Sequence, residues 1–167
     1  MNFTLISSVL SILIISVLLI NVNVPIVEVD YISVEKVVAI DYIAVLNALV
    51  HAQRGGSFKY FLSREIEANF TVEELIVDTS FKKAVVVVDH RWTRVKIAVF
   101  LRLRVLGEYE KQDIAGNKVK YILVEVCSDR PVQLCGGKLI SCNGTRYVVE
   151  LAEGDIIRDN RGLEVRV

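Results

Sequence analysis

The sequence predicts an α+β protein in which an N-terminal transmembrane helix and one or two amphipathic helices precede an antiparallel β-sheet, a meander or a small sandwich. Three observations predict this class. The chain carries no charged side chain before Glu28, apolar residues recur at helical spacing after Pro25, and from Phe81 onward they alternate with a period of two. At 167 residues the chain is the size of one domain.

The apolar N-terminal segment covers residues 3–20 and is long enough, at about 1.5 Å per residue, to cross a ~30 Å hydrocarbon core. We expect an uncleaved single-pass anchor that contacts membrane lipid through residues 3–20, with the C-terminal domain outside the cell membrane. A cleaved signal peptide and a buried core helix are the alternatives. The segment lacks the basic n-region and the Ala-x-Ala site of a signal peptide.

The start of the chain also shows a family resemblance. Phe3-Thr4-Leu5-Ile6, the apolar stretch that follows and Pro25 resemble the beginning of a mature type IV pilin or pseudopilin. The resemblance implies that this segment is an assembly helix with a proline kink, and that the protein is a subunit of a surface filament.

A helix is predicted over residues 37–54, with Ser33 as its N-cap, Glu35 in its first turn and Gly55-Gly56 at its C-terminal end. Many of its residues are β-branched, which lowers intrinsic helix propensity. Packing against the β domain or against another subunit must therefore stabilise this helix.

Ser57 is predicted to cap a second, shorter helix, whose apolar residues at helical spacing are Phe58, Phe61, Leu62 and Ile66. Residues 71–77 fit both a helix with a capping box and a strand, and this choice stays open. The predicted division is an anchor or signal segment at 1–24, a linker and helical segment at 25–70, and an antiparallel β domain at 71–167.

Strands are predicted wherever apolar residues form short runs or alternate. Residues 84–88 and 119–126 are apolar on both faces, which is typical of buried strands. The segment 93–105 alternates clearly, the polar connection 105–118 is expected to be a long surface turn, and 156–167 to form a final hairpin. Asn143-Gly144 predicts another hairpin.

The three cysteines are Cys127, Cys135 and Cys142, and their spacing lacks the Cys-x2-Cys pairs of a zinc site. We expect a disulfide between Cys135 and Cys142, which suits an extracytoplasmic domain. Three free thiols are the alternative. Asn69 and Asn143 each begin an Asn-x-Thr sequence, and both are candidate glycosylation sites.

Two groups of polar residues are candidates for function. Asp89 and His90 lie at a predicted turn and could form an acid–base pair, although no nucleophile accompanies them in the sequence. One face of the strand at 93–105 is basic, and this candidate interaction face comprises Arg94, Lys96, Arg102 and Arg104. Neighbouring glutamates offer cross-strand partners, so we expect much of the face to be ion-paired.

The sequence therefore predicts a non-enzymatic, membrane-anchored extracytoplasmic protein that acts in cell-surface structure or assembly through a protein partner or self-association. The alternatives are a secreted form, an assembly subunit of a secretion machine with a helix-plus-sheet cone domain, and a tethered enzyme or ligand-binding domain that uses the Asp89-His90 turn. No cofactor is expected. The 20 basic and 20 acidic side chains balance, so no nucleic-acid partner is expected.

Overall fold

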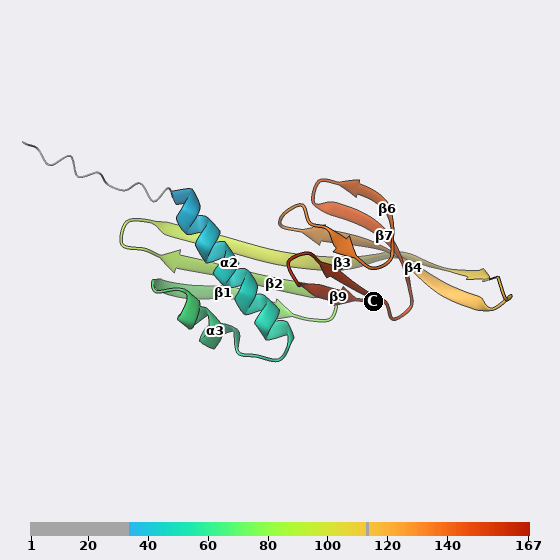
Figure 1. Ribbon diagram of the computed structural model, residues 1–167, viewed down its shortest axis with the longest axis horizontal. Helices are drawn as coiled ribbons and strands as arrows, with labels where there is room; N and C mark the ends of the chain where they lie inside the picture. Colours follow the sequence, from blue (N-terminus) through green and yellow to red (C-terminus); the bar gives the residue numbers. More distant parts are fainter. Residues whose placement is uncertain (1–33, 113) are drawn as a thin grey trace, which may run out of the picture. The chain divides into compact units, whose positions relative to one another are not determined.

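The computed structural model describes residues 34–112 and 114–167 (Figure 1). The predicted anchor, the pilin-like start and the linker up to residue 33 lie outside the described residues. Within the described ranges, none of the helices has the length and apolar character needed to span a membrane. Apart from Val34, the first residue of α2, the elements below belong to one compact unit, Glu35–Val167.

Among residues 34–68, two helices precede the strands, as the sequence predicts. α2 (Val34–Gln53) begins directly after Ser33, and the chain leaves it at Gly55, whose φ of 88° is available to glycine without strain. α3 (Phe58–Glu65) is capped by Ser57, whose Oγ accepts a hydrogen bond from Tyr60 N at 3.5 Å. The segment left open by the sequence is a strand, so the capping-box alternative is wrong.

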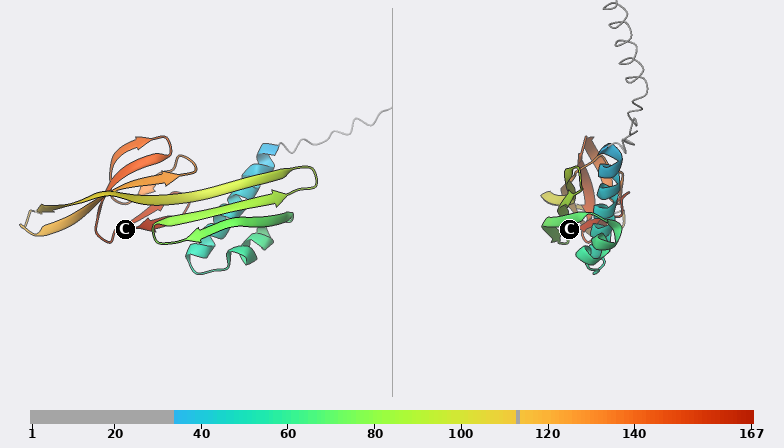
Figure 2. Two further views of the ribbon diagram at one scale, coloured as in Figure 1. Left: turned by 180° about the vertical axis from the view of Figure 1, so that it is seen from behind. Right: turned by 90° about the vertical axis from the view of Figure 1, so that its left-hand side faces the viewer.

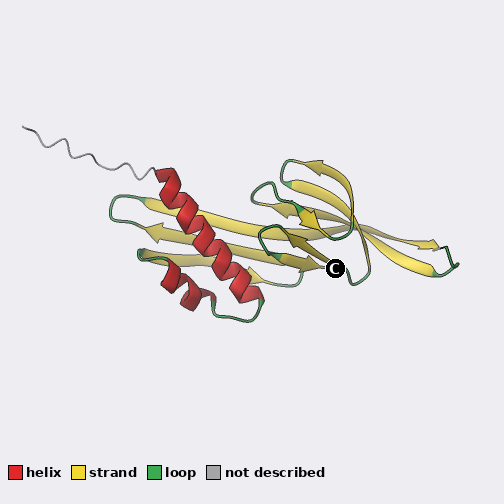
Figure 3. Cartoon of the chain, viewed as in Figure 1, coloured by secondary structure: helices red, strands yellow, loops and turns green. Residues whose placement is uncertain are grey.

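In the part of the chain that the structure describes, nine strands form two antiparallel sheets (Figure 3). The six-stranded sheet has the order β1-β2-β3-β4-β7-β6, and the small sheet has the order β5-β8-β9. The strands are β1 (Asn69–Val77), β2 (Phe81–Asp89), β3 (Arg94–Gln112), β4 (Lys118–Ser128), β5 (Leu134–Cys135), β6 (Lys138–Asn143), β7 (Arg146–Ala152), β8 (Ile156–Asp159) and β9 (Glu164–Arg166). The α+β class is thereby confirmed.

One hydrophobic core lies between the helices, the small sheet and one face of the large sheet. α2 and α3 lie across the same face of the large sheet (Figure 2). The core includes residues from every layer: Val45 and Leu49 of α2, Leu62 of α3, Val86, Val99 and Val126 of the large sheet, and Ile157 and Val165 of the small sheet. The predicted helical segment and β domain therefore share one core.

The connection predicted as a surface turn over 105–118 is instead mostly strand. β3 continues to Gln112 and pairs with β4 from Lys118 onward, after a bulge between Val105 and Gly107. The prediction was wrong because this ribbon is exposed on both faces, so its residues are polar like those of a loop. Lys120 Nζ lies 2.8 Å from Glu108 Oε2 across the two strands.

The predicted Asn-Gly hairpin exists, but its register differs by one residue. Asn143 of β6 pairs with Arg146 of β7, so Gly144 and Thr145 are the two turn residues. Gly144 has a φ of 60° at the first turn position, as in a type II′ turn. The edge strands β1 and β6 each carry a bulge, between Val72 and Glu74 and between Leu139 and Ser141.

Candidate functional site

The helix α2 exposes two large apolar side chains on the side that its own chain does not cover, beside the exposed polar residues Lys36 and Asn47. The covered side contributes Val45, Ala48 and Leu49, which are fully buried against the sheet. On the opposite side Ile40 and Ile43 are 60% and 54% exposed, one turn apart. We call this surface, made of Ala39, Ile40 and Ile43, the outward face of α2. Two neighbouring isoleucines that are each more than half exposed leave apolar surface in contact with water.

Asp41 and His90 form a close pair at the end of the sheet where the β2–β3 turn meets α2. His90 Nε2 lies 2.7 Å from Asp41 Oδ2, and the two side chains are 18% and 5% exposed. The sequence pointed to His90 but paired it with its neighbour Asp89, whose Oδ1 lies instead 3.2 Å from Arg94 Nε. Asp41 was missed because it lies 49 residues away in the sequence.

The Asp41–His90 pair lines a surface hollow of about 340 Å³ between α2 and the α3–β1 connection. His90 also lines a second hollow of about 380 Å³, together with Asp89 and Trp92 of the β2–β3 turn. A carboxylate that holds a histidine by one ring nitrogen leaves the other nitrogen free to accept a proton. The residues that line these two hollows include no serine, threonine or cysteine.

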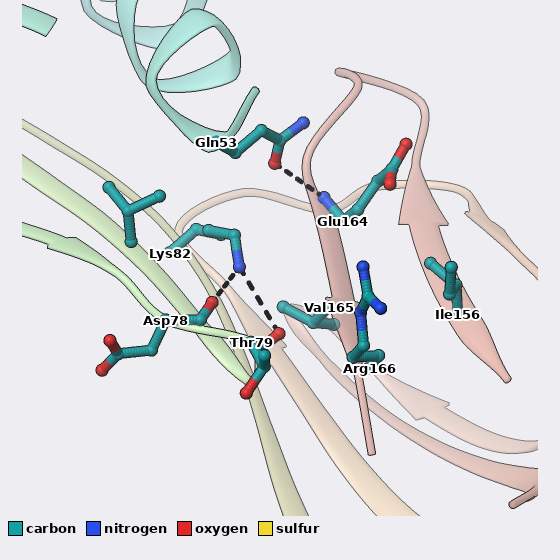
Figure 4. Close-up of a pocket in the computed structure, with 9 residues that line it drawn as sticks. Gln53, Asp78, Thr79, Lys82, Ile156, Glu164, Val165 and Arg166 are labelled. Atoms are coloured by element: carbon teal, nitrogen blue, oxygen red, sulfur yellow. Dashed lines mark hydrogen bonds between the residues drawn. The ribbon is translucent and has the colours of Figure 1, made fainter. Parts of the chain in front are cut away.

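A buried lysine lines another hollow, of about 180 Å³, beside the end of α2 (Figure 4). Lys82 is 6% exposed, and its Nζ donates hydrogen bonds to the carbonyl oxygens of Asp78 and, at 3.4 Å, Thr79. Burial lowers the pKa of Lys82, the positive charge of Arg166 lowers it further, and the charge of Asp78 opposes this. The ammonium group thus fastens the β1–β2 turn. This buried lysine was not predicted, because Lys82 and Lys83 resemble the polar start of a strand.

The most buried polar cluster centres on Arg161, in the β8–β9 turn. Its Nη1 donates to Asp129 Oδ1 and to Tyr42 Oη, both at 2.7 Å, and its Nη2 lies 2.8 Å from Asp159 Oδ2. Burial by itself would lower the pKa of Arg161, but Asp129 and Asp159 raise it above its ordinary value. The Tyr42 hydroxyl has a raised pKa because it is buried and donates to Asp129. These contacts join α2 to both sheets, so the cluster is structural.

The candidate interaction face lies on the side of the large sheet that the helices leave uncovered. Three of its four members are ion-paired: Arg94 with Asp89, Lys96 with Glu73 at 2.6 Å, and Arg104 with Glu125 at 2.9 Å. The fourth, Arg102, lies over the Phe81 ring, 5.6 Å from its centroid. Ion pairing of much of the face is as expected, but Glu73 of the edge strand was not foreseen as a partner.

All three cysteines are free thiols in the structure, and the expected Cys135–Cys142 disulfide is not formed. Cys135 belongs to β5 of the small sheet, whereas Cys142 belongs to β6 of the large sheet, so they do not face each other across a hairpin. Both candidate glycosylation sites, Asn69 and Asn143, are exposed at strand ends. Their use stays a prediction.

The described part of the chain thus offers an uncovered apolar helix face, an Asp–His pair beside two hollows, a buried lysine and a partly ion-paired basic face. Among these residues, no group of three or more histidine, cysteine, aspartate or glutamate side chains is arranged to hold a metal ion. Comparison with known proteins adds no relative: no family model, no curated protein and no solved structure matches this chain.

Proposed function

We propose that the chain is a non-enzymatic, membrane-anchored extracytoplasmic protein that assembles with further copies of itself through the outward face of α2, as a pilin-like surface subunit. The anchor is the apolar segment 3–20, and the α+β unit is the part presented outside the membrane. One observation carries the proposal. Ile40 and Ile43, on the side of α2 that the sheet does not cover, are more than half exposed.

Exposed isoleucines on a long helix are unfavourable for an isolated unit. Burying a fully exposed aliphatic side chain contributes about 1.5–3 kcal/mol. Because these two are a little over half exposed, covering both would contribute about 2–3 kcal/mol before the costs of association. A second copy fits this face well, because α2 follows the apolar segment 3–20 and parallel anchors in one membrane would bring the α2 helices of neighbouring copies together.

The first test is to disrupt the outward face in the full-length chain. The double variant Ile40→Glu, Ile43→Glu is expected to reduce assembly more than about tenfold, because burying an unpaired carboxylate costs several kcal/mol and about 1.4 kcal/mol is tenfold. Assembly is measured by chemical crosslinking in the membrane and by electron microscopy of material sheared from cells.

The matched control is the double variant Val105→Glu, Leu106→Glu, which introduces the same two charges at exposed apolar residues of β3. It is expected to assemble like the unmodified chain. Normal assembly by the α2 double variant would refute the proposal. If the unmodified chain forms small closed assemblies and no filaments, that result would favour the alternative function, an assembly subunit of a secretion machine with a cone-shaped domain.

A second candidate function, ligand binding at the Asp41–His90 pair, is favoured by the hollows of about 340 and 380 Å³ on either side of His90. It is tested by screening small polar ligands against the full chain by NMR and following the His90 ring signals. Ligand-dependent shifts that vanish in Asp41→Asn would support it. Screening without any shift at His90 would contradict ligand binding at this pair.

A further inference from the structure

A row of alternating arginine and cysteine residues crosses three strands on the uncovered face of the large sheet. Arg102 of β3 pairs in register with Cys127 of β4, and Cys127 pairs in register with Arg146 of β7. Residues opposite each other on neighbouring strands project from the same face, about 5 Å apart. The short cysteine side chain therefore lies between two long guanidinium side chains.

This arrangement forms a surface hollow of about 190 Å³ that is lined by Arg102, Arg104, Glu125, Cys127 and Arg146. Cys127 is partly buried while the three arginines are exposed, so the thiol lies toward the floor and the arginines form the walls. At roughly 30 Å³ per water molecule the hollow has space for about six waters, which is more than a phosphate or sulfate group requires.

The charges around the hollow do not balance. Glu125 is the single carboxylate in the lining, and Arg104 Nη2 already lies 2.9 Å from its Oε2. Within the described ranges, Arg102 and Arg146 have no carboxylate within the 4.0 Å limit of an ion pair. Stacking on Phe81 holds Arg102 in place without neutralising it. Two uncompensated positive charges therefore face each other across Cys127.

We propose that this hollow, here named the Arg-Cys-Arg site (Arg102, Cys127 and Arg146), binds a phosphate or sulfate group. A dianion matches the two uncompensated charges, and guanidinium groups donate paired N–H hydrogen bonds to such oxyanions from fixed directions. Arg104 borders the same hollow and adds a third donor group. The site lies on the sheet face opposite to α2, so it is independent of the assembly surface proposed above.

The position of Cys127 provides a direct test, because an anion held between the arginines covers the thiol. In the full-length Cys135→Ser, Cys142→Ser variant, Cys127 is the single cysteine. Its reaction with the uncharged reagent N-ethylmaleimide is measured with inorganic phosphate or with glycerol phosphate, at an ionic strength held constant with sodium chloride. If the occupied site is unreactive, the rate falls about tenfold at roughly ten times the dissociation constant.

Saturable protection by either compound supports the site. Protection by inorganic phosphate alone assigns it to the free ion, whereas protection by both assigns it to a phosphate group carried on a larger molecule. Arg146→Gln and Arg102→Gln are each expected to abolish protection. Arg94→Gln is the control, since Arg94 lies on the same face but pairs with Asp89.

A second measurement covers the case in which Cys127 reacts too slowly to follow. In an NMR titration with phosphate, the side-chain Nε–H signals of Arg102 and Arg146 are expected to shift. The Arg94 signal is expected to stay in place. If protection is absent and the Arg102 and Arg146 signals do not move at matched ionic strength, the inference is overturned.

Discussion

Arg161 shows how one side chain can join parts of the chain that lie far apart in sequence. It donates to Tyr42 of α2, to Asp129 beyond β4 and to the Phe100 carbonyl of β3, at 2.7, 2.7 and 3.2 Å. Its side chain is 10% exposed, so water screens these contacts little. The described buried side chains include no polar atom without a hydrogen-bond partner.

The variant Arg161→Met is expected to lower the free energy of unfolding by about 3–5 kcal/mol, because it leaves two buried carboxylates without their cation. Denaturant titration of the detergent-solubilised full chain, followed by circular dichroism, measures the loss. Arg158→Met is the matched control. Arg158 pairs with Glu164 but is 62% exposed, so its loss is expected to cost about 0–1 kcal/mol. Similar losses in the two variants would contradict a central role for Arg161.

Lys82 gives the stability a dependence on pH. Its pKa in the folded state is lowered from the ordinary 10.5, chiefly by burial. Between the lowered pKa and 10.5 the unfolded chain binds more protons than the folded chain, so the unfolding free energy rises with pH in that window. Below the lowered pKa both states carry the charge, and the full cost of burying it remains.

The unfolding free energy of the unmodified chain minus that of Lys82→Met is therefore expected to increase as the pH rises toward 10.5. The slope should stay below about 1.4 kcal/mol per pH unit, the limit for one proton. Taking the difference cancels the titration of groups that both proteins share. Denaturant titrations at several pH values between 7 and about 10.5 measure it. A difference that is constant or falls with pH would refute this assignment.

The structural roles of Arg161 and Lys82 could not be predicted from the sequence. Arg161 contacts residues more than 30 positions away, and Lys82 binds backbone carbonyl groups of a turn. His90 was identified from the sequence but was paired with Asp89, because its actual partner, Asp41, lies 49 positions away. The charged partners of Arg94 and Lys96 likewise depend on register, which the pattern of residue types does not specify.

At the scale of elements, the connection Gly136-Gly137 between β5 and β6 has little free space around it. Both glycines have positive φ values, of 108° and 67°. A Cβ added at Gly137 would lie 2.5 Å from Leu151 Cδ2 and 2.7 Å from the Glu150 carbonyl oxygen. The chain can therefore pass from the small sheet to the large sheet here only because these positions lack side chains.

Gly137→Ala is expected to lower the free energy of unfolding by about 2–5 kcal/mol, which combines a left-handed backbone with overpacking. Gly144→Ala is the matched control. Gly144 also has a positive φ, of 60°, but its added Cβ would meet no atom within 4 Å. Only the backbone cost, about 1–2 kcal/mol, applies there. Equal losses in the two variants, measured by denaturant titration, would show that the contacts at Gly137 relax freely.

The sequence predicted helices and strands correctly where local features such as apolar spacing and capping residues were clear. The apolar spacing of α2, the Ser57 cap and the buried run of β2 each predicted the right element. The ribbon of β3 and β4 was missed because a strand exposed on both faces has no apolar alternation. The Gly144-Thr145 turn shows that a strong turn dipeptide still leaves the register uncertain by one residue.

For the whole unit Glu35–Val167, the α+β class could be predicted from the sequence. The single hydrophobic core that the helices and the sheets share could not. A helix and a sheet that each have one apolar face must bury those faces against something, and here they bury them against each other. The same reasoning leaves the outward face of α2 unexplained within one copy, which is why the proposed function concerns assembly.

The bulges of the two edge strands bear on how copies of this protein associate. A flat, regular edge offers unpaired N–H and C=O groups to any other strand, and sheets with such edges grow into fibres without a defined end. Bulges in β1 and β6 twist both borders of the large sheet away from that geometry. The bulges thereby disfavour sheet-to-sheet growth. In the proposed assembly, contact between subunits would then depend on the side chains of α2 and not on the edges of the sheet.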